Sequence, residues 1–109
     1  EYPYSYAAPL VREYNLSGCA DIGHLVKYGY SVRDFFEQWT RNITIVHLHG
    51  VDFSTNPAKD HVSLNRLPDH AAKEIMEVLR HFTGVVSLEV FNKDHLDASL
   101  EFLSRYFSI

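Results

Sequence analysis

The chain has 109 residues, of which 46% are hydrophobic and 22% charged, proportions that are typical of one globular domain and exclude a disordered segment. The net charge is −4 and the charged residues are scattered along the chain, which argues against a nucleic-acid-binding surface. No apolar run approaches the roughly 18 residues that would cross a membrane. The single cysteine, Cys19, excludes an internal disulfide, favours a cytoplasmic setting and is expected to be a small core residue. Because the chain opens on Glu1 and not on methionine, we expect it to be a piece of a longer protein.

The first half of the chain predicts helices and strands in alternation. Apolar residues at helical spacing predict a helix over 6–15, and the small residues of 17–22 predict a buried strand. Ser31 begins the next helix, because Ser31 and Asp34 have the spacing of a capping box. The β-branched run 43–48 then predicts a parallel strand that is covered on both faces.

The second half continues this order. We expect a long polar loop over 50–66, a helix over 68–82, an apolar strand over 85–91 and a last helix capped by Asn92. Strands that alternate with helices predict parallel βαβ units. The expected fold class is therefore α/β, one partial domain over 1–109 that forms the C-terminal portion of a (β/α)8-barrel, about three βα units. Such a piece has an open sheet edge, so the remainder of the barrel or a homo-oligomer partner is expected to cover it.

Polar residues fall at or just beyond the carboxyl ends of the predicted strands: Asp21, His24, His47 and Glu89. Parallel α/β proteins build their sites there, because the loops converge while the strands hold them. Glu89 interrupts an apolar run, where a charge is costly to bury without a partner such as a metal ion. Aspartate, glutamate and histidine together suit zinc, manganese, cobalt or iron. Asp21 and His24 are expected on a strand end and the loop after it, where an aspartate can equally be a turn former.

Other polar residues permit two interpretations. His47 and His49 stand two apart, and a strand through both would point them to one face, where one could bind metal and the other meet substrate. Both could instead hydrogen-bond to backbone. Asp60 and His61 lie in the predicted loop, where they could be ligands or a solvated tip. Three further histidines on polar helix faces are assigned no function: His70, His81 and His95.

Four short motifs follow one another along the chain: DIGH over 21–24, HLHG over 47–50, DHVSL over 60–64 and SLEVF over 87–91. Their order resembles that of the xylose-isomerase-like barrel superfamily. This superfamily contains sugar-phosphate isomerases and epimerases and the apurinic endonuclease family 2 enzymes. The resemblance covers nearly the whole chain and implies a divalent-metal site.

The resemblance assigns roles position by position. His24 matches a histidine that binds metal in the endonucleases and meets substrate in the epimerases. The hydrolytic branch has an Asp-x-His pair in the loop that here reads Asp60-His61, with no residue between, which makes His61 the better ligand candidate of the two. The implied metal-binding core that both branches share is Asp21, His47 and Glu89.

Within the superfamily, DIGHL over 21–25 followed by HLHG and by KDHVSL over 59–64 looks most like the cobamide-remodelling phosphodiesterases, which cleave the nucleotide loop of a cobamide and release α-ribazole. The departure of HLHG from the endonuclease motif HLND favours these enzymes over DNA repair. The resemblance then implies a metal-dependent phosphodiester hydrolase with zinc, manganese or cobalt, about one to three ions. Its substrate would be a small-molecule phosphodiester or sugar phosphate. Glu89, His49 and Asp60 are the candidate catalytic or substrate-contacting residues, and a further metal-binding glutamate is expected before Glu1.

Two other functions stay open. A metal-dependent sugar or sugar-phosphate isomerase would keep a single ion at Asp21, His47 and Glu89, with Glu89 and the upstream glutamate moving a proton beside a carbonyl. A truncated, non-catalytic module would lack a complete site and function by association. Metal content separates these possibilities.

Overall fold

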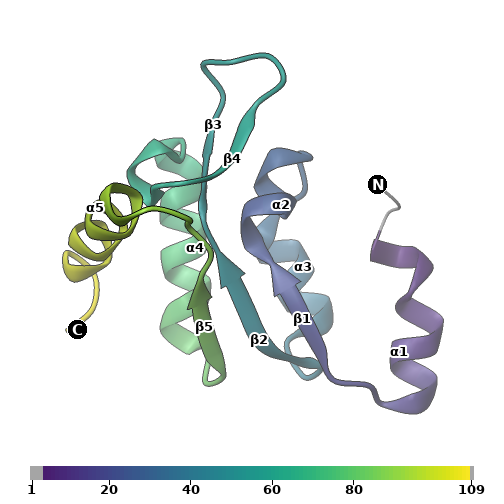
Figure 1. The fold of residues 1–109 in the computed structure, drawn as a ribbon. Coiled ribbons are helices and arrows are strands. Elements are labelled where there is room, and N and C mark those ends of the chain that lie inside the picture. Colours follow the sequence, from purple (N-terminus) through teal and green to yellow (C-terminus); the bar gives the residue numbers. More distant parts are fainter. Residues whose placement is uncertain (1–3, 109) are drawn as a thin grey trace.

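The computed structural model describes residues 4–108 and shows a mixed α/β fold with a parallel three-stranded sheet and five α-helices (Figure 1). In chain order its elements are the 3-10 helix Tyr4–Tyr6, α1 (Ala8–Tyr14), β1 (Gly18–Asp21), α2 (Ile22–Lys27), α3 (Val32–Trp39), β2 (Ile43–Leu48), β3 (Gly50–Asp52), β4 (Lys59–Val62), the 3-10 helix Leu64–Arg66, α4 (Asp69–His81), β5 (Val85–Leu88) and α5 (Lys93–Ser104). These α-helices and strands follow the predicted alternation, with two additions, the helix α2 and the hairpin β3–β4.

The sheet has the strand order β1-β2-β5, and neighbouring strands within it run parallel. In this register Asp21 lies beside His47, and His47 lies beside Ser87. Parallel neighbours need crossovers, and the helices α2, α3 and α4 supply them. The carboxyl ends of the strands therefore meet at one edge of the sheet, and the β3–β4 hairpin projects beyond that edge (Figure 1).

One face of the sheet packs against helices and forms the core. Val46 and Leu48 are fully buried on this face, as are Ile22 of α2 and Ile75 of α4. The helix α3 contributes an apolar stripe to this core, formed by the buried side chains of Val32, Phe35, Phe36 and Trp39.

The opposite face of the sheet is open. Side chains alternate along a strand, and on this face Ile45 is 40% and Val85 62% exposed, while Cys19 is also exposed. Two predictions were therefore wrong: the strand 43–48 is covered on one face only, and Cys19 is not a core residue. A β-branched apolar run cannot by itself show whether a second layer covers it.

The segment 50–66 is not a loop. It contains the antiparallel pair β3 and β4, followed by a short 3-10 helix. The segment after β1 is likewise not a loop, because α2 begins at Ile22 directly after the strand. The last strand ends at Leu88, earlier than predicted, so Glu89 follows it.

Two helix starts that the sequence predicts are confirmed by their caps. The Ser31 hydroxyl accepts a hydrogen bond from the backbone N–H of Asp34 at 3.2 Å. The Asn92 side chain accepts one from the backbone N–H of His95 at 2.9 Å. Each cap satisfies a donor that the first helical turn leaves unpaired.

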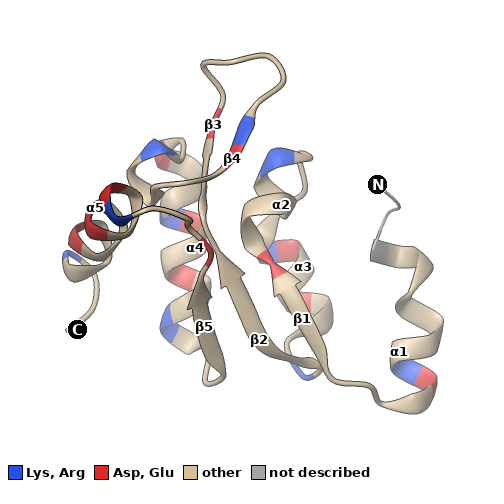
Figure 2. Ribbon diagram, in the orientation of Figure 1, with Lys and Arg blue, Asp and Glu red and all other residues tan. Residues whose placement is uncertain are grey.

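Charged residues lie mainly on the helices and the hairpin, and the strands of the sheet are nearly free of them (Figure 2). In the part of the chain that the structure describes, no helix has the length and apolar character needed to cross a bilayer.

Removing a core side chain should test the packing of the helical layer. Leu79 of α4 is 8% exposed, and Leu100 of α5 is 41% exposed. We expect Leu79→Ala to lower the free energy of unfolding by about 2–4 kcal/mol, because it leaves a cavity, and Leu100→Ala to lower it by much less. Urea unfolding followed by circular dichroism measures both values. Equal losses would contradict this assignment of the core.

Candidate functional site

The carboxyl edge of the sheet brings the predicted site residues together. Asp21 and His47 are neighbours in the register of β1 and β2. Glu89 extends the ladder beyond β5, because its backbone N–H donates to the carbonyl of Leu48 at 2.9 Å. The side chains of all three lie on the open face of the sheet and are partly exposed.

Asp21, His47 and Glu89 form the first of two groups of ligand atoms, which we call the sheet cluster. One ligand atom from each residue lies within 4.8 Å of the other two, and the His47 Nδ1 is 2.9 Å from the Glu89 Oε1. Two carboxylates at this separation repel each other, and a cation between them would offset the repulsion. The burial and chemistry of this group therefore suit a metal ion.

Asp21, His24, His49 and His61 form the second group, the histidine cluster, with ligand atoms again within 4.8 Å of one another. Asp21 caps α2 by accepting a hydrogen bond from the His24 backbone N–H at 2.9 Å. The same helical turn places the His24 Nδ1 3.2 Å from the Asp21 Oδ2. The motif DIGH is thus a helix start that places both side chains at one point.

The hairpin brings His61 to this point from a distant part of the chain. In the β3–β4 ladder Gly50 pairs with Val62 and Val51 pairs with Asp60, so His61 is an extra residue in a β-bulge. Bulges redirect a side chain relative to the strand. Here the His61 Nε2 comes within 3.7 Å of the Glu89 Oε2, which places this member of the histidine cluster next to the sheet cluster.

Asp60 lies behind the histidines. Its carboxylate accepts hydrogen bonds from the Lys27 Nζ at 2.7 Å and from the His61 Nδ1 at 2.8 Å, and the His24 Nε2 is 3.4 Å away. The hydrogen bond from Lys27 and then that from His61 hold the pKa of Asp60 well below its usual value. Asp60 belongs to neither group of ligand atoms in the described residues, and it leaves the His61 Nε2 and the His24 Nδ1 facing the site.

His49 is the one fully buried member of the histidine cluster. Its Nε2 is 2.9 Å from the Asp21 Oδ1, and its Nδ1 accepts a hydrogen bond from the His61 backbone N–H at 3.1 Å. Burial by itself would lower the pKa of His49, but the hydrogen bond with Asp21 and the negative charges of Asp21 and Asp60 outweigh burial and raise it. A buried ring whose two nitrogens are both engaged presents no accessible atom to a substrate.

The Asp21 carboxylate stays ionised for a related reason. Burial alone would raise its pKa, but the hydrogen bonds from His49 and from the His24 backbone outweigh burial and lower it. Both of these hydrogen bonds fall on Oδ1. Oδ2 is therefore the oxygen that remains available to a cation.

Lys27 is a site residue that the sequence analysis missed. It lies three residues after His24 on α2, so helical periodicity places both side chains on one face. That spacing was the available signal, but it needed the knowledge that this segment is a helix. The three histidines that were assigned no function belong to neither cluster: His70, His81 and His95.

The donor set fits a divalent transition metal. Both clusters offer imidazole nitrogens and carboxylate oxygens, the ligands that zinc, manganese and cobalt accept. Cys19 is not a member of either cluster, although partial desolvation of its thiol, followed by the charges of Asp21 and Glu89, raises its pKa.

Comparisons with protein-family models, curated proteins and solved structures give no significant match to this chain.

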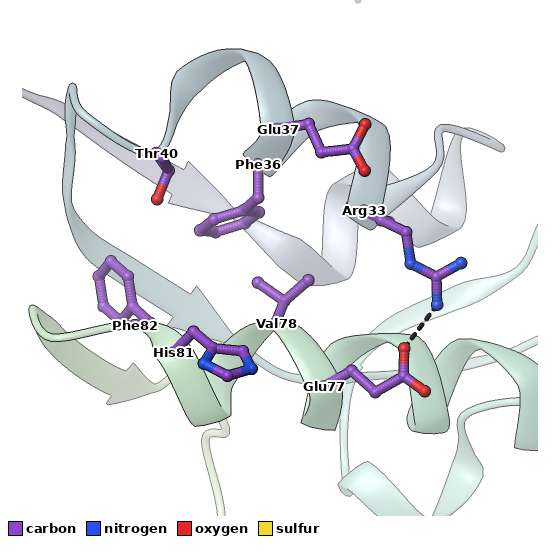
Figure 3. Close-up of a pocket in the computed structure, with 8 residues that line it drawn as sticks. All are labelled: Arg33, Phe36, Glu37, Thr40, Glu77, Val78, His81 and Phe82. Atoms are coloured by element: carbon purple, nitrogen blue, oxygen red, sulfur yellow. Dashed lines mark hydrogen bonds and ion pairs between the residues drawn. The ribbon is translucent and has the colours of Figure 1, made fainter.

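A groove between α3 and α4, drawn in Figure 3, contains none of the predicted ligands. It is lined in part by Phe36 and Phe82 and by the ion pair of Arg33 with Glu77, in which the Arg33 Nη2 is 2.5 Å from the Glu77 Oε2. The carboxyl edge of the sheet remains the candidate site.

The pairing of Asp60 can be tested through stability. With chelator present, we expect Asp60→Asn to lower the free energy of unfolding at pH 7 by about 1–2 kcal/mol, because Lys27 and His61 lose an anionic acceptor. The folded-state pKa of Asp60 is lowered, so its stabilisation is complete above the unfolded pKa of about 3.9 and is lost as the pH falls below that value. Urea unfolding at pH 7, 5 and 3 should therefore show an equal gap between wild type and variant at pH 7 and 5 and a smaller gap at pH 3.

The matched control is Asp97→Asn. Asp97 pairs with Lys93 on the exposed surface of α5, where ion pairs contribute little. A gap for Asp60→Asn that is no larger than this control at pH 7 would contradict the role given to Asp60.

Proposed function

We propose that this chain forms the C-terminal part of a (β/α)8-barrel of the xylose-isomerase-like type and supports divalent-metal-dependent phosphodiester hydrolysis. One observation carries the proposal. The sheet cluster and the histidine cluster share Asp21, and His61 of the histidine cluster lies close to Glu89 of the sheet cluster. Adjacent groups of this kind favour more than one metal ion, and paired ions are typical of phosphoryl-transfer hydrolases.

The architecture supports the barrel. Parallel strands with helices on one face and an open opposite face are what a section of such a barrel would have, since the inner face of a barrel is covered by side chains from its other strands. The candidate site lies at the carboxyl ends of the strands, where barrel enzymes of this class build theirs.

The residues of the chain have distinct tasks in this proposal. Asp21, His47 and Glu89 would hold one ion, and Asp21, His24 and His61 would hold another. A divalent ion bound here would polarise phosphoryl oxygens and lower the pKa of bound water toward 7. Asp60 would keep the His24 and His61 rings in place, since a carboxylate behind a ligating histidine fixes its orientation.

The isomerase remains the second candidate, and the surroundings of Glu89 weigh against it. A proton-transfer base needs an oxygen that faces the substrate. Here Oε1 lies 2.9 Å from the His47 Nδ1 and Oε2 lies 3.7 Å from the His61 Nε2. Both oxygens are directed at ligand candidates, which favours a metal-binding glutamate over a free base.

The substrate class follows from the same chemistry. Paired cations stabilise the charge of a phosphodiester that is attacked by water, and the nucleotide loop of a cobamide, which the sequence motifs suggest, is a diester of this kind. A simple aryl phosphodiester provides a first probe of the chemistry, because it needs no specific pocket.

Metal content and hydrolysis test the proposal directly. The full-length protein, loaded with Zn²⁺, Mn²⁺ or Co²⁺ and dialysed, should retain more than one ion per chain by elemental analysis. It should also hydrolyse bis(p-nitrophenyl) phosphate, and EDTA should abolish that activity. His47→Ala should lose metal and activity, whereas the control His95→Ala should keep both. Hydrolysis that survives EDTA would sink the proposal.

His61→Ala separates the two candidate reactions. If the site is a hydrolase, this variant should lose the ion of the histidine cluster and most of its phosphodiesterase activity. An isomerase that uses the sheet cluster alone would keep its single ion. Elemental analysis of the variant beside wild type gives the answer, and unchanged metal content would favour isomerisation.

A further inference from the structure

His49 connects two candidate ligands that come from different parts of the chain. Its Nδ1 accepts the His61 backbone N–H, and its Nε2 lies 2.9 Å from the Asp21 Oδ1. A backbone N–H can only donate, so Nδ1 must carry a lone pair. In the neutral ring the proton is then on Nε2, which donates to Asp21, and the Gly50 carbonyl 3.2 Å from Nδ1 is a neighbour and not an acceptor.

The hydrogen bond to His61 supports a strained backbone. His61 has a φ of 54°, a left-handed conformation that is strained for a residue other than glycine. It is the extra residue of the β-bulge, so its N–H is not used by the ladder. The bond to His49 gives that N–H a partner and holds the backbone that directs the His61 side chain into the site.

The His49 ring is itself held on two sides. The His61 ring stacks on it with centroids 4.0 Å apart and an interplanar angle of 14°. On another side the ring lies against Gly23, where a Cβ would come within 2.0 Å of the ring carbon Cε1. The glycine of the DIGH motif thus makes room for His49.

We infer that His49 is a positioning residue that holds the Asp21 carboxylate and the His61 bulge in place for metal binding, without being a ligand itself. This role rests on the proposed function for its metal ion, but the hydrogen bonds of His49 with Asp21 and His61 are present without a metal ion. One buried ring thereby joins the end of β1 to the hairpin, so that both clusters keep their shared geometry.

The protonation of the ring can be observed directly. In ¹H–¹⁵N NMR spectra of the wild-type protein, we expect His49 to be the Nε2–H tautomer without metal and to keep that proton after Zn²⁺ is added. A ligand bound through Nε2 would lose the proton. Loss of this signal on Zn²⁺ binding, or an Nδ1–H tautomer without metal, would overturn the inference, and neither result depends on a variant that folds.

Substitution of His49 measures the effect on metal affinity. Loss of a residue that orients ligands typically weakens metal binding by about 10–100-fold, and we expect this for Zn²⁺ binding to His49→Leu by competition with a chromophoric chelator. His49→Gln can still donate to Asp21 and should recover part of the loss.

Gly23→Ala displaces the His49 ring without removing the side chain of any candidate ligand. We expect it to weaken Zn²⁺ binding in the same direction as His49→Leu. The matched control is Gly18→Ala, because a Cβ at Gly18 meets only the flexible Ile43 Cδ1 at 3.2 Å and the Asn42 carbonyl oxygen at 3.7 Å. Its affinity should equal that of wild type.

The outcomes separate this inference from the proposed function. A wild-type protein that binds none of the metals tested would contradict the proposed function. Wild-type binding that is unchanged in both His49→Leu and Gly23→Ala would leave the metal centre intact and overturn the role of His49 alone.

Discussion

The Asp21 carboxylate is the interaction on which the site depends. Its Oδ1 accepts hydrogen bonds from the His24 backbone and the His49 ring, and its Oδ2 faces the His24 ring. One side chain therefore ends β1, starts α2 and fixes the positions of two histidines. Its negative charge suits the amino end of a helix, and hydrogen bonding lowers its pKa against the effect of burial. A residue with this many partners cannot change without moving both clusters.

The open face of the sheet gives this arrangement its access. Helices cover the opposite face and supply the core, while the site residues lie toward the uncovered face. If the chain is a section of a barrel, further strands would close over this face and add ligands to the sheet cluster. The rigidity of the site comes from within the described residues, because its members are held by a strand register, a helix cap and a bulge.

Much of the fold could be predicted from periodicity. Alternating apolar strands and amphipathic helices indicate parallel βαβ units, and Ser31 and Asn92 mark helix starts through their caps. The hairpin within 50–66 was missed because its strands are short and polar, so they have no apolar alternation. The open face was missed because a run such as ITIVHL contains no information about what lies on its second side.

Local sequence determined which residues reach the carboxyl edge. A strand that ends at Asp21, and one that contains His47 and ends at Leu48, place polar groups there wherever the strands pair. The tertiary structure decided what each residue does. His49 is buried and connects Asp21 with His61 only because β3 and β4 pair with a bulge, and Asp60 lies behind the histidines only because Lys27 approaches it from α2. These contacts join residues 12 to 33 positions apart, and spacing along a chain cannot specify contacts that depend on how separate elements pack.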